Sequence, residues 1–179
     1  MSKHDDVKRL KEHLAKNTTE PFVLRQDDLD YCACYILLGG YSGTIKKALR
    51  YICCKLAELC IIGAPKNFFY RLAGVKIGRN VTIATGVVLD YLCCDLIEIG
   101  DGCVLGMGCM IVAHEFTHVE SRIGRVKLGK DVTIGARTVV RSGVSIGDNA
   151  IVGAMSLVVR DVEAGSTVIG VPARIVKRQ

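Results

Sequence analysis

Large aliphatic residues recur every six positions through most of residues 75–160. The steps of six form three runs: Ile77, Ile83, Leu89; then Ile99, Leu105, Ile111; then Leu128, Ile134, Val140, Ile146, Val152 and Val158. A helix repeats every 3.6 residues and a flat strand every two, so neither element explains this period. Period six predicts short strands joined by repeated corners, which close into a triangular coil whose stacked turns share one core.

A smaller side chain accompanies the large one, two positions before the next unit. These smaller residues are Val81, Val87, Cys93, Cys103, Cys109, Val132, Thr138, Val144, Ala150, Ser156 and Val162. We expect them to point inward, which predicts structural rather than reactive thiols at the three cysteines. Glycine often follows the large aliphatic residue, as at Gly100 and Gly135, and we expect it to permit tight corners.

Residues 1–74 contain no hexads and are predicted to form a helical cap, whereas residues 75–179 form the coil domain. The cap should contain a short helix at 5–16, a buried apolar run at 31–38 and a longer helix capped by Thr44. Helical spacing joins Ile45, Ala48, Leu49, Ile52, Leu56, Leu59 and Cys60 into an apolar face, and Lys46, Lys47, Arg50 and Lys55 make another face basic. The apolar face either packs on the first coil or forms an amphipathic basic surface that contacts a membrane peripherally.

Composition narrows the possible functions. Half of the 179 residues are hydrophobic, with 19 Gly and no Trp, which indicates one aliphatic core. The net charge of +6 is scattered rather than gathered in a stripe, which argues against a nucleic-acid partner. No stretch is long and apolar enough to span a membrane. The polar start does not resemble a signal peptide, so we expect a cytoplasmic protein whose nine cysteines are thiols.

The hexads stop after Ile111 and resume at Leu128. The interruption, a predicted projecting loop at about 113–125, contains His114, Glu115 and His118. Insertions at coil corners point outward, where binding residues are commonly placed. A neutral imidazole can take a proton from an attacking hydroxyl or amine, and a carboxylate can fix its tautomer. We therefore predict that His114 is a general base, that Glu115 orients it and that His118 faces the substrate.

The hexads, the histidine in the interruption and the ending "VIGVPARIVK" at 168–177 together resemble the hexapeptide-repeat acyltransferases. The resemblance covers residues 71–177 and implies a mainly β fold, a left-handed parallel β-helix. It also implies a homotrimer that uses acetyl-coenzyme A, without a metal, to acetylate a hydroxyl or amine of a sugar or nucleotide sugar.

The same resemblance assigns further residues by their positions in the motifs. Ala136 and Ala154 match contacts of the pantetheine arm of coenzyme A. The cations that match its phosphate end are Arg160, Arg174 and Lys177. Asp90 matches an acidic contact to the acceptor in the sugar-specific branch.

Two other functions remain as alternatives. A γ-class carbonic anhydrase shares the fold but needs three zinc-binding histidines, and here no histidine lies between His13 and His114. A non-catalytic β-helix subunit that binds partners through residues 1–70 would need neither a histidine in the interruption nor basic residues near the C-terminus.

Overall fold

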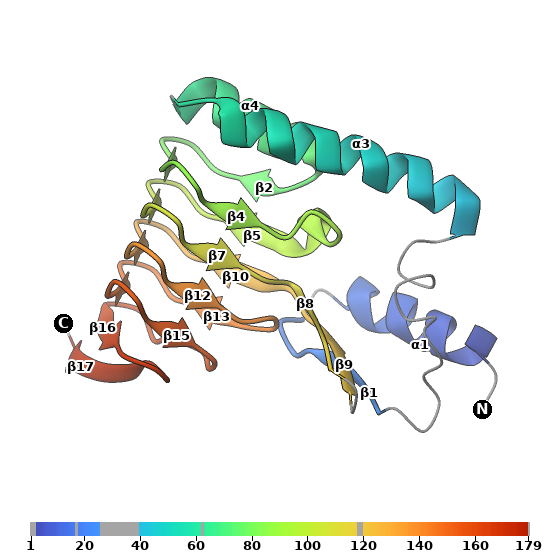
Figure 1. The fold of residues 1–179 in the computed structure, drawn as a ribbon. Helices are drawn as coiled ribbons and strands as arrows, with labels where there is room; N and C mark the ends of the chain where they lie inside the picture. Colours follow the sequence, from blue (N-terminus) through green and yellow to red (C-terminus); the bar gives the residue numbers. More distant parts are fainter. Residues whose placement is uncertain (1–2, 17, 26–39, 62, 118–119, 179) are drawn as a thin grey trace.

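Three parallel sheets form the sides of a triangular β-helix in the computed structural model, which describes residues 3–16, 18–25, 40–61, 63–117 and 120–178 (Figure 1). The first sheet contains β2 (Lys76–Ile77), β5 (Ile97–Ile99), β10 (Val126–Leu128) and β13 (Ser145–Ile146). The second contains β3 (Thr82–Ile83), β6 (Val104–Leu105), β11 (Thr133–Ile134), β14 (Ile151–Val152), β16 (Ser166–Ile169) and the antiparallel β17 (Arg174–Arg178). The third contains β4 (Val88–Leu89), β7 (Met110–Ile111), β12 (Val139–Val140) and β15 (Leu157–Val158).

The strand register stacks equivalent hexad positions on one another. Ile99 of β5 pairs with Ile77 in the coil before it and with Leu128 in the coil after it. Leu105 and Ile111 occupy the same position on the other two sides and are fully buried. All of the predicted smaller inward residues are buried as well. The predicted hexad core is therefore confirmed.

The hexad glycines lie at corners where a side chain would be obstructed, as expected, and the obstruction comes from the next coil. A Cβ on Gly100 would lie 2.3 Å from the carbonyl oxygen of Gly129 in the next coil. A Cβ on Gly135 would lie 2.3 Å from the backbone nitrogen of Ala154. Neither glycine has a positive φ. These glycines are required because successive coils approach closely, not because the backbone turns sharply there.

Helix α4 (Gly63–Ala73) closes the first coil. Its buried side chains donate hydrogen bonds to carbonyl groups that this coil would otherwise leave at an open edge. Lys66 donates to Ala84, Asn67 to Val81 and Tyr70 to Val87, at 2.7–3.0 Å. Helix α4 therefore covers the open end of the first coil.

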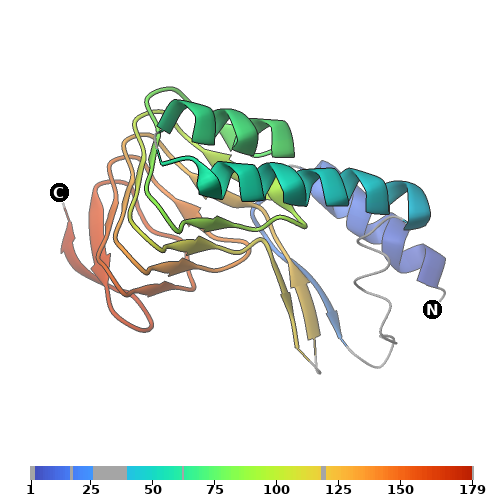
Figure 2. The same cartoon turned by 45° about the horizontal axis from the view of Figure 1, so that its top comes forward.

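Helix α3 (Gly40–Leu59) lies beside α4, over the same end of the coil (Figure 2). It begins before the predicted capping residue Thr44. Cys54 and Ala57 face inward and are buried, whereas Ile45, Leu49 and Ile52 are exposed. Helix α3 is therefore amphipathic, as expected. Its predicted apolar face is exposed and points away from the first coil. The apolar run at 31–38 lies outside the described residues.

The predicted projecting loop is a β-hairpin. Its strands are β8 (His114–Phe116) and β9 (Glu120–Ile123), and β1 (Phe22–Arg25) adds to β9 as a third antiparallel strand. The short predicted helix is α1 (Lys3–Ala15), which lies near this hairpin rather than over the coil end (Figure 1). The segment before residue 26 therefore supports the hairpin, and α3 and α4 cap the coil.

Candidate active site

The imidazole of His114 is held by Asp90. Asp90 follows β4 in the first coil, and its Oδ2 accepts a hydrogen bond from Nδ1 of His114 at the start of β8. The Asp90 side chain is 2% exposed and the His114 side chain 20%. Because Nδ1 is engaged, the second ring nitrogen, Nε2, is the one that can exchange a proton with a ligand.

Backbone N–H groups hold the Asp90 carboxylate in place. Oδ1 accepts from Leu92 and Cys93, and Oδ2 accepts from Ala113 and His114, at 2.9–3.3 Å. Burial by itself raises the pKa of Asp90, but the hydrogen bond and charge of His114 and the backbone donors together lower the pKa below its usual value. Asp90 is therefore a buried, ionised carboxylate whose position is fixed from both of its oxygens.

Glu115 does not contact the imidazole, contrary to the sequence-based expectation. Its Oε2 accepts from Nε of Arg141 at 2.6 Å, and its Oε1 accepts from the hydroxyl of Ser142 at 2.6 Å and the backbone N–H of Ser142 at 3.1 Å. Successive side chains of a strand point to opposite sides, so His114 and Glu115 diverge although they are adjacent in sequence. The ring of Phe116 lies 5.0 Å from that of His114, as expected for residues two apart.

Asp90 also differs from its expected place. The resemblance suggests that it contacts the acceptor, but its carboxylate is buried and fully used by backbone groups and His114. Register explains the contact: Leu89 pairs with Ile111, so the residue after β4 lies directly below the start of the hairpin. His118 lies outside the described residues.

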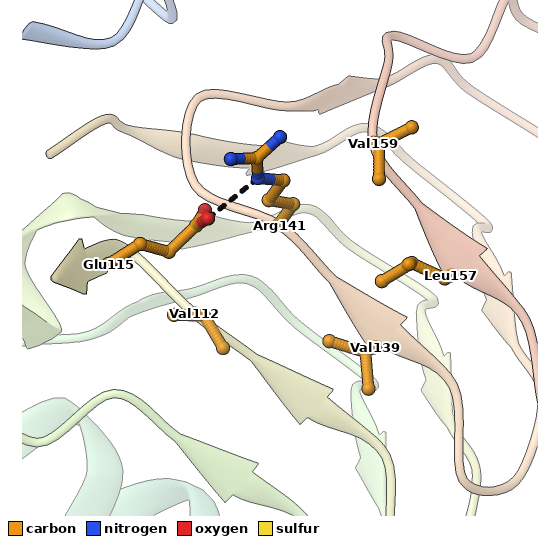
Figure 3. A pocket seen from close by; sticks show the side chains of 6 residues that line it. All are labelled: Val112, Glu115, Val139, Arg141, Leu157 and Val159. Atoms are coloured by element: carbon orange, nitrogen blue, oxygen red, sulfur yellow. Dashed lines mark hydrogen bonds and ion pairs between the residues drawn. The ribbon is translucent and has the colours of Figure 1, made fainter. Parts of the chain in front are cut away.

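A pocket of about 330 Å³ lies at the base of the hairpin, on the side to which Glu115 points (Figure 3). Its lining residues are Val112, Glu115, Val139, Arg141, Leu157 and Val159. The valines and the leucine form an apolar wall along three successive coils, and the Glu115–Arg141 ion pair lies at one end (Figure 3). Such a surface suits an extended, mostly apolar ligand segment with a polar group at one end.

The residues expected to contact coenzyme A lie on the last coils. Ala136 and Ala154 follow β11 and β14, at equivalent corners of successive coils. Arg160 follows Val159 of the pocket wall and is exposed. Arg174 and Lys177 are exposed on β17, at the C-terminal end of the β-helix. These residues therefore lie between the pocket and the C-terminal end of the β-helix, and not beside Asp90.

His114 and two side chains beside it are of types that ligate metals. Among the residues that the structure describes, one group of metal-ligating side chains gathers, namely Asp90, Cys93 and His114. Nδ1 of His114 already donates to Asp90, and burial raises the pKa of the Cys93 thiol, which disfavours the thiolate that binds metals. The group also offers one histidine where the zinc site of a γ-class carbonic anhydrase needs three. We therefore interpret it as a hydrogen-bond network.

The triangular parallel β-helix, with a histidine–carboxylate pair at a projecting hairpin, is the architecture of a hexapeptide-repeat protein. Residues 125–160 match the family described as bacterial transferase hexapeptide (six repeats), and residues 70–91 and 97–113 match the hexapeptide repeat of succinyl-transferase. The putative acetyltransferase YvoF of Bacillus subtilis is 36% identical over 133 residues, which cover 74% of this chain and 77% of that protein. The chain belongs to the hexapeptide-repeat acyltransferase family.

Other comparisons agree with this family. The galactoside O-acetyltransferase of Escherichia coli is 29% identical over 122 residues, 63% of this chain and 58% of that enzyme. A hexapeptide-repeat acetyltransferase from Vibrio cholerae, solved with acetyl-coenzyme A, superposes with a TM-score of 0.66 at 19% identity and covers 79% of this chain and 91% of that one. These neighbours confirm the predicted left-handed β-helix.

Proposed function

We propose that this enzyme transfers an acetyl group from acetyl-coenzyme A to a hydroxyl or amine of a sugar or nucleotide sugar, with His114 as general base and Asp90 as the group that orients it. The observation that supports this most directly is the buried Asp90 carboxylate on Nδ1 of a histidine at a projecting hairpin. The structural neighbour that binds acetyl-coenzyme A supports the donor, and the galactoside acetyltransferase supports a sugar acceptor.

The residues account for each proton in the reaction. Nε2 of His114 takes the proton of the acceptor as its oxygen or nitrogen attacks the thioester carbonyl. Asp90 stabilises the imidazolium that forms. The tetrahedral intermediate then collapses, the carbon–sulfur bond breaks and the thiolate of coenzyme A takes the proton from Nε2. The products are the acetylated acceptor and free coenzyme A, so the histidine is regenerated.

The apolar wall of the pocket is our proposed place for the pantetheine arm. Because this wall lies on the Glu115 side of the hairpin, away from the His114 ring, the base for an arm bound there would be the His114 of a neighbouring subunit in the trimer proposed below. Arg160, Arg174 and Lys177 would meet the phosphates, since exposed guanidinium and ammonium groups suit that charge. Glu115 would be a wall residue that positions Arg141, because both of its oxygens are already bonded.

The experiment for the function is a thiol-release assay with acetyl-coenzyme A against a panel of sugars, nucleotide sugars and amino acids. We expect release that depends on the acceptor and on His114. A non-catalytic β-helix subunit would release no thiol with any acceptor and would not bind coenzyme A in calorimetry, which would contradict the proposal.

Arg174→Ala should raise the KM for acetyl-coenzyme A several-fold and leave the KM for the acceptor nearly unchanged, because the lost contact is to the phosphate end. The ratio of the variant KM to the wild-type KM should fall toward one as salt rises, because salt screens the contact that only the wild type makes. Steady-state kinetics at two ionic strengths measure both effects. Equal rises in both KM values would instead indicate a folding defect.

The chain should form a homotrimer, because the pocket is open on one side and a neighbouring subunit would supply its missing wall. Light scattering at micromolar concentration should give a mass three times that of the 19.4 kDa chain. A stable monomer with full activity would contradict both the trimer and a shared site.

A further inference from the structure

The outward face of α3 and α4 forms an exposed apolar surface, here called the apolar platform. Its residues are Ile45, Leu49, Ile52, Leu56, Leu59 and Leu72, whose exposed fractions run from 39% to 78%. Scattered exposed aliphatic residues are ordinary, but a contiguous set of this kind marks an interaction surface. Within the described part of the chain, no element packs over it (Figure 2).

Contacts on the opposite side fix the orientation of α3. The thiol of Cys54 lies 3.8 Å from that of Cys94 in η2 (Cys94–Leu96), and Arg50 forms a 3.0 Å ion pair with Asp95 of the same short helix. At about 100° per residue, Ile45, Leu49, Ile52 and Leu56 lie on the side of α3 that faces away from Cys54. Rotating the platform inward would break these contacts, so its exposure follows from the packing of the helix.

The platform is bordered by positive charge. Residues 40–73 contain six Lys or Arg and one acidic residue. Of these cations, Lys66 is buried against the first coil and Arg71 donates to carbonyls of that coil, so the border consists of Lys46, Lys47, Arg50 and Lys55 on α3. The acidic residue, Glu58, is paired with Lys55 at 2.7 Å. Lys46 lies on one flank of the apolar platform and Lys55 on the other, and both are exposed. Long lysine stems can lie along an apolar surface while their ammonium groups reach outward.

The border also contains a groove suited to a small anionic group. A pocket of about 390 Å³ between α3 and α4 is lined by Lys46, Leu49, Arg50, Cys53, Leu72, Ala73 and Gly74. It therefore places Lys46, and Arg50 with its partner Asp95, beside Leu49 and Leu72 of the platform. A phosphate with an attached apolar chain satisfies both parts of this lining.

We propose that the apolar platform binds the surface of an anionic phospholipid bilayer. The aliphatic side chains would enter the boundary between headgroups and acyl chains, and the lysines and arginines would contact phosphates. The protein would lie on the bilayer, because no helix among the described residues is long and apolar enough to cross one. A second copy fits less well, since pairing two identical platforms would bring two cationic borders together.

This proposal does not depend on the acyltransferase reaction. If the proposed trimer forms, cyclic symmetry carries its three platforms at the same level along the symmetry axis. Three weak contacts to one bilayer would then act together and strengthen binding without any new contact in the subunit.

Co-sedimentation of the full chain with vesicles tests the proposal. One set contains phosphatidylcholine alone and the other phosphatidylcholine with phosphatidylglycerol. We expect the partition coefficient to be at least about tenfold higher on the anionic vesicles, and to fall in 0.5 M salt to about the neutral-vesicle value, because charge and apolar burial both contribute.

Ile45→Ser combined with Ile52→Ser should lower partition onto anionic vesicles at least about tenfold. Met107→Ser is the matched control, since Met107 is 61% exposed on a coil corner and should leave partition unchanged. Thermal unfolding of both variants, followed by circular dichroism, checks that the fold is intact. The platform variant should unfold at or above the wild-type temperature, because it exchanges exposed aliphatic groups for polar ones.

Three results would overturn the proposal. The wild-type chain could fail to bind either vesicle set, which would mean that something else covers the platform. The platform variant could bind as well as the wild type. Light scattering could show that the platform variant loses its oligomeric mass, which would make the platform a contact between subunits.

Discussion

His114→Ala should lower kcat on the order of 10²–10⁴-fold while the KM for acetyl-coenzyme A changes little, because general base catalysis contributes about this much to a rate. The physical reason is that the variant keeps the pocket but has no group at Nε2 to take the acceptor proton. Steady-state kinetics of the wild type and the variant measure both parameters.

A matched variant separates catalysis from folding. In His114→Asn the side-chain amide can donate to Asp90 as Nδ1 does, yet it cannot act as a base. We therefore expect near wild-type stability with the same loss of kcat. His118→Ala should cost much less. If His118→Ala abolishes turnover and His114→Ala does not, His118 rather than His114 is the base. If neither substitution lowers turnover, this hairpin does not remove the proton.

The hexad period determined the fold correctly because each coil repeats the same inward positions. Leu128 and Ile146, three hexads apart in an uninterrupted run, could be assigned to one ladder from their spacing alone. The orientation of α3 could not, since helical spacing shows that a face is apolar without showing what it contacts. Only the inward contacts of Cys54 and Arg50 decide that the face turns outward.

The pairing of Asp90 with His114 illustrates a limit of local sequence arguments. Adjacent Glu115 was the obvious carboxylate, but a strand sends neighbouring side chains to opposite sides. A signal for Asp90 was nevertheless present: aligning the first two coils by their hexads places the residue after Leu89 below the start of the interruption. Contacts between coils, rather than along the chain, build this site.

Asp90→Asn should lower kcat roughly 10²–10⁴-fold, whereas Glu115→Gln should change it much less. The asparagine amide cannot accept from the backbone donors at both oxygens, so the imidazole loses its fixed tautomer and the charge that stabilises the imidazolium. Glu115→Gln keeps an acceptor for Ser142 and leaves His114 untouched. A larger loss in Glu115→Gln than in Asp90→Asn would restore the carboxylate expected from the sequence.

Stability provides an independent test of the same contact. The pKa of Asp90 is lowered in the folded state, so its ionised form contributes stability above the unfolded-state pKa, about 4, and this contribution is lost as the pH falls below that value toward the folded-state pKa. Asp90→Asn should therefore reduce the free energy of unfolding by about 2–4 kcal/mol at pH 7, and the difference from wild type should shrink in acid. Urea unfolding at pH 7 and at pH 3.5 measures it. A difference that does not change with pH would mean that the Asp90 charge is not what holds the imidazole.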